Sequence, residues 1–227
     1  MNSDNEKRLA AKEAVKSIKN GMIVGLGSGS TSAFMIKALG QQVADGLKIQ
    51  CVPSSEETKK LAQSLNITLL ELENVEKIDV NIDGADEFDP QMRLIKGGGG
   101  ALLREKIVAH NSKYNIIIAD STKAVDRLGK FKLPVETIPF ATRSIFRELE
   151  SHNLKPHIRQ NKNGNYKTDQ KNDIIDLDIF EKTNLEELNQ MLQNIPGIVE
   201  TGLFLNTTDL IIYVKGESIH KIDKKEL

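Results

Sequence analysis

The chain has 227 residues, of which 28% are charged and 39% hydrophobic, and its formal net charge is −1. This composition is typical of a globular protein with one or two domains, and it provides no bulk electrostatic attraction to nucleic acid. No apolar run approaches the ~20 residues that cross a bilayer, and the charged start MNSDNEKRLAAKEAVKSI does not resemble a signal peptide. The single cysteine, Cys51, excludes an internal disulfide and suits the cytoplasm, and without a CxxC motif or a His-rich cluster we expect no zinc site. The near-zero net charge and the lack of a long apolar run predict neither a nucleic-acid nor a membrane partner.

The first 123 residues alternate between helical and strand-like patterns. The helical segments are EKRLAAKEAVKSI, STSAFMIKALGQQV, SEETKKLAQSLN and GGGGALLREKIVAHNS. The strand-like segments are MIVGLG, LKIQCVPSS, TLLEL, KIDVNIDGADE and KYNIIIADSTK. Strands that alternate with helices predict a mostly parallel, Rossmann-like sheet with helices on both faces.

The order of the elements changes after residue 129. Strand, helix, strand, turn, strand, helix and strand follow one another, and this β-α-β-β-α-β order predicts a ferredoxin-like α+β domain. Its turn contains Asn163-Gly164, a strong hairpin signal. The final segment DLIIYVKGESIHKI comes too late for that unit, and we expect it to rejoin the first sheet. The predicted domains are therefore residues 1–129 plus 206–227, Rossmann-like, and residues 130–205, ferredoxin-like.

The segment VGLGSGSTS leads from a strand into a helix, an arrangement that suits an anion. It lacks the GxxxxGK[ST] of a Walker A loop. It also departs from the dinucleotide motif, because Ser30 replaces the last glycine and the second strand does not end in an acidic residue. Two interpretations remain. One is a cradle for phosphate or carboxylate, with hydroxyls from Ser28, Ser30 and Thr31; the other is a tight turn with capping serines.

The segment DVNIDGADEFDP places carboxylates at the end of a strand, the edge where open α/β sheets bind ligands. They are Asp83, Asp86, Glu87 and Asp89. The spacing is not that of an EF-hand. A solvated acidic turn, a magnesium site, and proton carriers that also accept hydrogen bonds from sugar hydroxyls all remain open.

Four consecutive glycines follow in IKGGGGALLREK, and such a run suits close approach of the backbone to a ligand. Lys96 stands just before them. It either forms a salt bridge with a nearby carboxylate or stabilises an oxyanion with its positive charge. Glu105 lies on the next helix, whose apolar residues predict burial. These residues are Leu102, Leu103, Ile107 and Val108. Lys123, in IADSTK, is either an ordinary lysine at a strand end or a cation for the phosphate.

Taken together, these motifs resemble the A-type ribose-5-phosphate isomerases. The resemblance runs through VGLGSGSTS, VPSSEET, DGADEFD, KGGGGALLREKIVA, IADSTKAVDRLGKFKLPVETIP and IPGIVETGLF, nearly the whole chain. It implies an aldose–ketose isomerase of the non-oxidative pentose phosphate pathway that interconverts ribose 5-phosphate and ribulose 5-phosphate without metal or organic cofactor. It also implies a Rossmann-like catalytic domain, a small ferredoxin-like domain, and a homodimer or homotetramer.

The resemblance also implies roles for individual residues. The base falls on Glu105, the acidic pair on Asp83 and Asp86, and the active-site lysine on Lys96. The substrate and phosphate positions fall on Ser28, Gly29, Ser30, Thr31, Lys7, Lys123, Gly97, Gly98 and Gly99. Two positions depart from the family pattern, because Ser28 and Leu103 stand where many members have threonine. Ser28 keeps the hydroxyl, whereas Leu103 removes a hydrogen-bonding group beside Glu105.

Two other functions are compatible with these motifs. A sugar-phosphate-sensing module of related fold would bind the ligand without turnover, although no helix-turn-helix segment precedes the domain and the candidate base and lysine are both present. A metal-dependent sugar-phosphate isomerase would use the aspartates as ligands, and activity in excess chelator separates it from the metal-free reaction.

Overall fold

The computed structural model describes residues 3–226. Packing divides the chain into two compact units. The first unit comprises the described residues of Met1–Ala85, together with Arg104–Ala124 and the described residues of Asn206–Leu227. The second unit comprises Asp86–Leu103 and Val125–Leu205. No helix within residues 3–226 is both long enough and apolar enough to cross a membrane.

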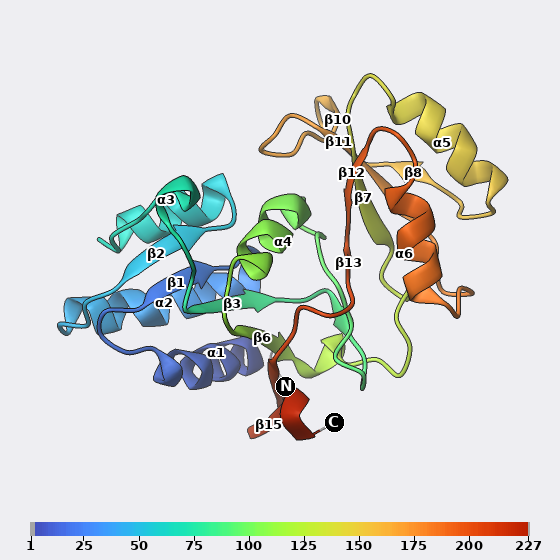
Figure 1. Ribbon diagram of the computed structural model, residues 1–227. Coiled ribbons are helices and arrows are strands. Elements are labelled where there is room, and N and C mark those ends of the chain that lie inside the picture. Colours follow the sequence, from blue (N-terminus) through green and yellow to red (C-terminus); the bar gives the residue numbers. More distant parts are fainter. Residues whose placement is uncertain (1–2, 227) are drawn as a thin grey trace. The chain divides into compact units, whose positions relative to one another are not determined.

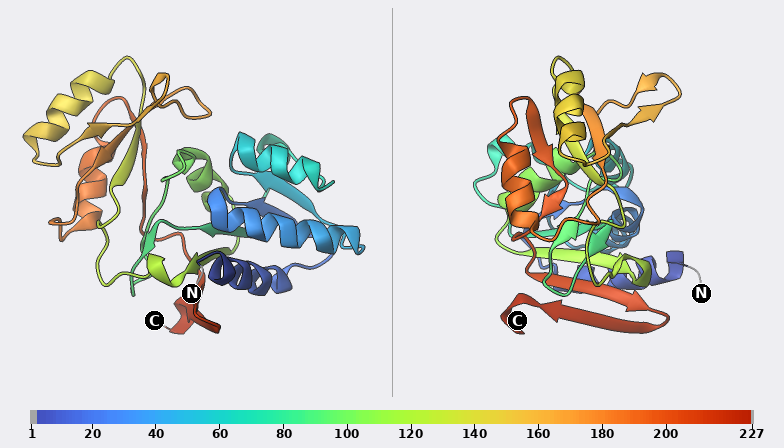
Figure 2. Two further views of the ribbon diagram at one scale, coloured as in Figure 1. Left: turned by 180° about the vertical axis from the view of Figure 1, so that it is seen from behind. Right: turned by 90° about the vertical axis from the view of Figure 1, so that its right-hand side faces the viewer.

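The first unit is built on a six-stranded sheet in the order β15-β14-β6-β3-β1-β2 (Figure 1). The strands are β1 Ile23–Leu26, β2 Gln50–Pro53, β3 Val80–Gly84, β6 Asn115–Asp120, β14 Leu210–Lys215 and β15 Ser218–Asp223. All neighbouring pairs are parallel except β14 and β15, whose antiparallel hairpin forms one edge of the sheet (Figure 2, right, in red). The mostly parallel sheet and the return of the C-terminal segment to it are therefore confirmed.

Helices cover both faces of this sheet because its strands are apolar on both faces. The helices are α1 Ser3–Ala14, α2 Gly29–Ala44, α3 Glu56–Ser64 and α4 Leu102–His110, with short 3₁₀ turns at η1 Val15–Ser17, η2 Leu72–Asn74, η3 Ser121–Lys123 and η4 Lys224–Glu226. On one face α1 and α2 lie side by side over Val24 and Leu26 of β1 (Figure 2, left). Gly25 points to the opposite face, where a Cβ atom would come within 2.8 Å of Val108 on α4.

One predicted strand of this unit does not form. The segment TLLEL makes a single bridge, between Leu69 and Cys51, and then bends into η2. Beyond the bridge, Leu70 and Leu72 are partly buried and pack against the cluster of Val52, Ile78 and Val108. The segment thus buries its leucines without extending the ladder, although its composition favours a strand.

The second unit contains a four-stranded antiparallel sheet in the order β12-β7-β11-β8. Its elements are β7 Leu133–Thr137, α5 Thr142–Ser151, β8 His157–Ile158, β11 Asp173–Leu177, α6 Leu185–Gln193 and β12 Ile198–Thr201. Antiparallel pairing in this order is the ferredoxin-like arrangement, which confirms the predicted fold class. Ile145 and Leu149 of α5 and Leu188 and Leu192 of α6 are buried in its core. The predicted hairpin forms between β9 Gln160–Asn161 and β10 Gly164–Asn165, around Lys162 and Asn163.

A small three-stranded sheet gives the second unit a segment that the predicted domains placed in the first. Its order is β13-β5-β4, with β4 Glu87–Phe88, β5 Leu94–Ile95 and β13 Leu203–Phe204. Because β5 pairs with β13, residues 86–103 pack with the second unit, whereas the predicted boundary assigned them to residues 1–129. This pairing joins residues about one hundred positions apart, so no local pattern in the sequence indicates it.

Candidate active site

The predicted anion loop and Asp83 meet at the carboxyl edge of the first sheet. In the sheet, β2 lies on one side of β1 and β3 lies on the other. The topological switch point, where doubly wound sheets bind ligands, therefore lies between β1 and β3. The Asp83 carboxylate, at the end of β3, accepts a hydrogen bond from the Ser28 backbone N–H at 3.0 Å, and from the Ser32 hydroxyl at 3.2 Å. Asp83 is 1% exposed. The carboxylate therefore fixes the turn that follows β1.

Close approach requires glycine at position 27, and a left-handed backbone conformation favours it at position 29. A Cβ atom on Gly27 would lie 2.0 Å from the Asp83 Oδ1 atom, and Gly29 has φ +85°. Helix α2 begins at Gly29, and the Ser28 side chain makes no capping hydrogen bond. The first N–H groups of a helix lack intrahelical acceptors, and in α2 these are the groups of Gly29, Ser30 and Thr31.

The Ser28 hydroxyl instead joins a buried cluster of hydroxyl groups. Its Oγ atom lies 2.8 Å from Ser54 Oγ and 2.9 Å from Ser55 Oγ, and the Thr58 hydroxyl donates to the Gly27 carbonyl at 2.9 Å. Ser55 caps α3 by accepting a hydrogen bond from the Thr58 N–H at 3.1 Å. These hydroxyl residues belong to the motif VPSSEET, but the sequence did not predict that they support the glycine turn.

The two lysines predicted to bind phosphate lie on segments joined by Glu6. Lys7 is on α1, with its ammonium 3.4 Å from Asp4 Oδ1, and Lys123 ends η3. The buried Glu6 carboxylate accepts hydrogen bonds from the Ser121 N–H at 2.9 Å and the Ser121 hydroxyl at 2.8 Å. It also accepts from the Gly216 N–H at 2.8 Å. Glu6 therefore holds the turn that carries Lys123 against α1, a role the sequence analysis missed.

These contacts shift the pKa of Glu6. Burial by itself raises the pKa of the carboxyl, but the hydrogen bonds from the backbone and the side chain outweigh it, so the pKa lies below its ordinary value. The Glu6 carboxylate is consequently ionised over the whole neutral range.

Glu105 lies in the first turn of α4 and is 5% exposed. The C-terminal end of α4 is anchored to the sheet through two buried amides, because Asn81 donates to the Asn115 side chain at 3.0 Å and Asn115 donates to the Ala109 carbonyl at 3.1 Å. Near its start, Arg104 forms a 2.8 Å ion pair with Glu56 of α3. These contacts fix the helix that presents Glu105.

The burial of α4 follows the prediction only in part. Leu102 and Val108 are buried and Leu103 is half-buried, whereas Ile107 is 39% exposed. The exposed residue was expected in the core because an apolar residue one helical turn from Leu103 fits a buried face. A helix that packs on one side only leaves such a residue at its margin.

The second unit contains the remaining predicted site residues. The Asp86 Oδ2 atom accepts a hydrogen bond from the Gly98 N–H at 2.7 Å. A Cβ atom on Gly98 would lie 2.6 Å from Asp86, and Gly97 has φ +94°, so both positions require glycine. Lys96 is 3% exposed, with its ammonium 5.5 Å from the centroid of the Phe204 ring. The carbonyl groups of this glycine loop accept hydrogen bonds from Arg159 and Tyr166, which the sequence analysis did not single out.

The acidic segment separates into residues with different surroundings. Glu87 accepts hydrogen bonds from the N–H groups of Gly129 and Phe131, and Asp89 accepts from the Arg93 side chain and backbone. These two carboxylates stabilise turns of the second unit. Across residues 3–226, no cluster of three or more His, Cys, Asp or Glu side chains has a geometry that could hold a metal ion.

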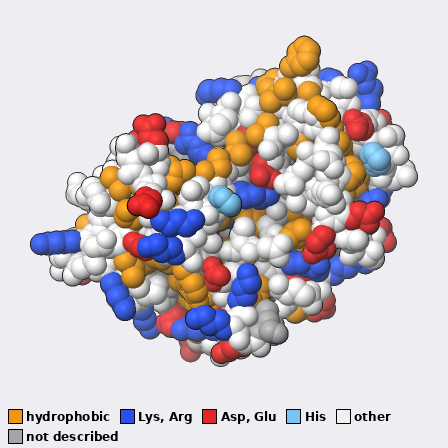
Figure 3. All heavy atoms as spheres, in the orientation of Figure 1, with side chains coloured by type: hydrophobic (Ala, Val, Ile, Leu, Met, Phe, Trp, Pro, Cys, Tyr) orange, Lys and Arg blue, Asp and Glu red, His pale blue; other side chains and the backbone are white. Residues whose placement is uncertain are grey.

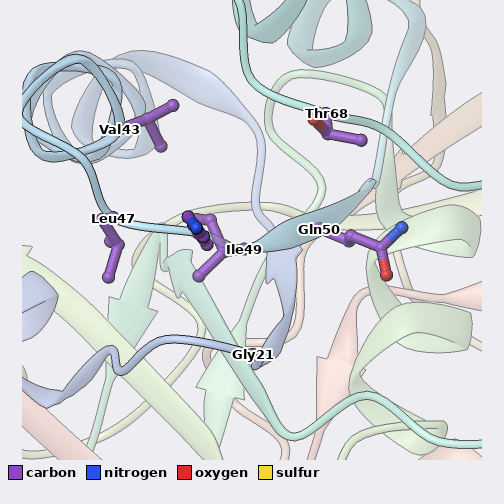
Figure 4. A pocket seen from close by; sticks show the side chains of 7 residues that line it. Gly21, Val43, Leu47, Ile49, Gln50 and Thr68 are labelled. Carbon is purple, nitrogen blue, oxygen red and sulfur yellow. The ribbon is translucent and has the colours of Figure 1, made fainter.

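A hollow of the first unit lies at the opposite edge of the sheet (Figure 4). Its volume is about 400 Å³. It is lined by Gly21, Val43, Leu47, Lys48, Ile49, Gln50 and Thr68. Gly21 precedes β1 and Gln50 begins β2, so this hollow is at the amino ends of the strands. It therefore does not include Ser28 or Asp83, which follow the carboxyl ends.

Charged side chains of both signs are interspersed on the face drawn in Figure 3. This distribution agrees with the formal net charge of −1.

Cys51 is buried, and burial raises the pKa of its thiol to about 12, which suits a core residue and not a nucleophile.

The fold and the site geometry define a class, the doubly wound α/β proteins with a glycine turn and a helix N-terminus at the switch point. The family model of ribose 5-phosphate isomerase A (phosphoriboisomerase A) matches residues 50–218. Ribose-5-phosphate isomerase A of Listeria monocytogenes is 46% identical over 222 residues, which cover 97% of this chain and 99% of that protein. The relative of the same name from Desulfatibacillum aliphaticivorans is 48% identical over 220 residues, covering 95% of this chain and 96% of that protein.

Solved structures agree. A D-ribose-5-phosphate isomerase in complex with phospho-erythronic acid matches with a TM-score of 0.95 and 40% identity, covering 99% of this chain and 100% of that chain. Ribose 5-phosphate isomerase A from Methanocaldococcus jannaschii matches with a TM-score of 0.94 and 37% identity, covering 98% and 100%. The chain belongs to the ribose 5-phosphate isomerase A family.

Proposed function

We propose that the protein interconverts D-ribose 5-phosphate and D-ribulose 5-phosphate. Family membership supports this reaction, as does the relative whose structure holds a phosphorylated sugar acid, phospho-erythronic acid. The observation in this chain that carries the proposal is the glycine turn at the switch point, which Asp83 holds in place through the Ser28 N–H. This arrangement joins an anion site directly to a carboxylate suited to proton transfer.

The 5-phosphate binds at the start of α2. The N–H groups of Gly29, Ser30 and Thr31 and the hydroxyls of Ser30 and Thr31 donate hydrogen bonds, and the ammonium groups of Lys7 and Lys123 add positive charge. Because the phosphate does not react, its binding energy serves to position C1 and C2 of the sugar.

Glu105 is the base that moves hydrogen between the two carbons. In the open-chain aldose its carboxylate removes the proton from C2, and the electron pair forms the C1–C2 double bond of a cis-enediolate with negative charge on O1. The O2 proton is then transferred to O1, the carbonyl forms at C2, and Glu105 returns its proton to C1. The aldose and the ketose are isomers, because oxidation at C2 balances reduction at C1 within the molecule and Glu105 ends as it began, so no external oxidant or reductant is required.

Lys96 stabilises the negative charge on the enediolate oxygens, assisted by the backbone of Gly97, Gly98 and Gly99. Asp83 and Asp86 accept hydrogen bonds from sugar hydroxyls, and Asp83 transfers the protons that open the furanose ring.

The reaction proposed needs neither metal nor organic cofactor. We further propose a cytoplasmic enzyme that assembles as a homodimer or homotetramer, with the sugar phosphate as its small-molecule partner. Sedimentation of the active protein at micromolar concentration tests the assembly, and a strictly monomeric active species contradicts it.

The decisive experiment follows the substrate by NMR in deuterated water, using dialysed protein with excess chelator. Wild type should produce ribulose 5-phosphate and exchange the C–H proton, whereas activity restored only by magnesium or manganese indicates a metal-dependent isomerase. Glu105→Gln should lower turnover and exchange together by ~10²–10⁴-fold, because the amide cannot accept the carbon-bound proton. The control is Glu57→Gln, at an exposed position of α3 in the same unit. Near-normal turnover in Glu105→Gln excludes it as the base, and binding of ribose 5-phosphate without turnover by wild type indicates a sensing module.

A further inference from the structure

Arg159 contacts the glycine loop with one edge of its guanidinium group. It lies between β8 and β9, and its side chain is 16% exposed. The Nη1 atom donates to the Gly97 carbonyl at 3.1 Å and to the Gly98 carbonyl at 3.0 Å. The other edge is bound by Asp176, with Nε donating to Oδ2 at 2.9 Å and Nη2 donating to Oδ1. Asp176 thereby orients the guanidinium toward the loop.

Tyr166 extends the same contact by one residue. Its hydroxyl donates to the Gly99 carbonyl at 3.0 Å, and its ring centroid lies 5.8 Å from the guanidinium carbon of Arg159. Three successive carbonyl groups of the loop are therefore bound by two side chains near the β9–β10 hairpin. On its other side the loop is held by Asp86 through the Gly98 N–H.

A run of four glycines needs such support. Glycine loses more conformational freedom on ordering than any other residue, so an unsupported run samples many backbone conformations. This run follows Lys96 directly and leads into the helix that carries Glu105. A displacement of about 1 Å in a reacting or stabilising group can lower a rate by ~10²-fold.

We propose that Arg159, supported by Tyr166, is a positioning residue that holds the Gly97–Gly99 backbone in the conformation needed for turnover. The inference rests on the proposed function, in which Lys96 and this loop stabilise the enediolate. Arginine is required because its planar group binds two carbonyl oxygens and a carboxylate at the same time, whereas the lysine ammonium is a compact point charge.

The experiment compares Arg159→Lys and Tyr166→Phe with Arg127→Lys. Arg127 is a matched control in the same unit, because it also donates to a backbone carbonyl, that of Lys182 at 3.2 Å, and also lies over an aromatic ring, that of Phe180. Two measurements are made on each protein. One is kcat and KM for ribose 5-phosphate; the other is amide hydrogen exchange over residues 94–103, which does not depend on catalysis.

Arg159→Lys should lower kcat by at least tenfold with KM changed less than threefold, and should speed exchange of the Gly98 and Gly100 amides by at least tenfold. These amides are bonded to Asp86 and to the Gly97 carbonyl. Tyr166→Phe should shift both quantities about threefold in the same directions, and Arg127→Lys should shift neither.

An Arg159→Lys protein with kcat within twofold of wild type, or with lower kcat but unchanged loop exchange, overturns the proposal. Equal effects in Arg127→Lys also overturn it. If Arg159→Lys does not fold, Tyr166→Phe provides the test. Unchanged kcat and unchanged loop exchange in that folded variant refute the proposal. A wild type without isomerase activity refutes the proposed function instead, while the exchange comparison still measures whether Arg159 holds the loop.

Discussion

In both glycine segments of this protein a carboxylate binds a backbone N–H group, whereas the backbone carbonyl groups are bound by different kinds of side chain. In each, a carboxylate accepts a backbone N–H, from Ser28 to Asp83 in the first unit and from Gly98 to Asp86 in the second. The carbonyl side differs. The Gly27 carbonyl accepts from the Thr58 hydroxyl, whereas the Gly97 and Gly98 carbonyls accept from the Arg159 guanidinium.

This difference follows from what each segment adjoins. The first runs directly into the sixteen-residue helix α2, which continues its backbone order, and neutral hydroxyls suffice to support the turn. The second contains four consecutive glycines before α4 begins, and a charged, bidentate donor supplies the additional constraint. The motif DGAD therefore contains one carboxylate for each glycine segment. A phosphate site and a charge-stabilising site should respond differently when these contacts are changed.

The largest effect is expected at the lysine of the second segment. Lys96→Met keeps most of the side-chain length but removes the cation, so kcat should fall by ~10²–10³-fold, as when an oxyanion donor is lost. KM and inhibition by inorganic phosphate should change less than threefold. Steady-state kinetics check this, with Lys162→Ala in the exposed β9–β10 loop as control. A rise in KM with unchanged kcat would assign Lys96 to substrate binding instead.

The first segment should show the opposite pattern. Thr31→Ala or Lys123→Ala removes a donor to the phosphate, and a hydrogen bond to a charged group contributes about 1.5–3 kcal/mol, so KM should rise about tenfold or more. The value of kcat should remain within threefold. The measurements are KM for ribose 5-phosphate and the inhibition constant of inorganic phosphate. Lys37→Ala, exposed on α2, is the control, and unchanged constants in both variants remove this segment from the site.

A smaller effect is expected from the hydroxyls beneath the first segment. Thr58→Val removes the donor to the Gly27 carbonyl without changing the shape of the side chain, and one hydrogen bond contributes about 1 kcal/mol. KM should therefore rise about fivefold with little change in kcat. Thr58→Ser retains the hydroxyl and should restore KM to within twofold of wild type. Identical constants for the valine and serine variants would show that the hydroxyl does not support the loop.

The smallest effect on turnover is expected at Glu136, a fully buried carboxyl of β7 outside both segments. Burial raises its pKa, and hydrogen bonds from Asn172 and Thr168 offset this only in part. Because the folded-state pKa is raised, the stability that this group contributes is present below its ordinary pKa of 4.5 and is lost as the pH rises through the folded-state value.

The difference in unfolding free energy between Glu136→Gln and wild type should therefore shift in favour of the variant as the pH rises above about 4.5. Urea unfolding between pH 4 and pH 8 measures it. A pH-independent difference contradicts the raised pKa. Glu6→Gln provides the opposite case, because its lowered pKa gives stability that is present above 4.5 and lost as the pH falls.

The sequence by itself determined most of the fold and the place of the glycine turn at the end of β1. Alternation of strands with helices predicted the parallel sheet, and the β-α-β-β-α-β order predicted the ferredoxin-like unit. The segment VGLGSGSTS predicted a turn from a strand into a helix, and its binding of an anion stays a prediction. These features can be read because periodicity, turn residues and helix starts are local properties of a few consecutive residues. The segment TLLEL shows the limit, since it makes one bridge and then packs its partly buried Leu70 and Leu72 against the cluster of Val52, Ile78 and Val108.

The tertiary structure decided which side chains support the site. By residue type alone, Asp83, Asp86, Glu87 and Asp89 were equivalent, and the family resemblance selected Asp83 and Asp86. The hydrogen-bond partners show that these two lie beside the glycine segments, whereas Glu87 and Asp89 stabilise turns. The contacts from Arg159 to Gly97 and from Glu6 to Ser121 join residues 62 and 115 positions apart. Such pairs leave no local pattern in the sequence, because Arg159 and Glu6 taken alone are compatible with ordinary surface charges. Only the folded chain brings donor and acceptor together.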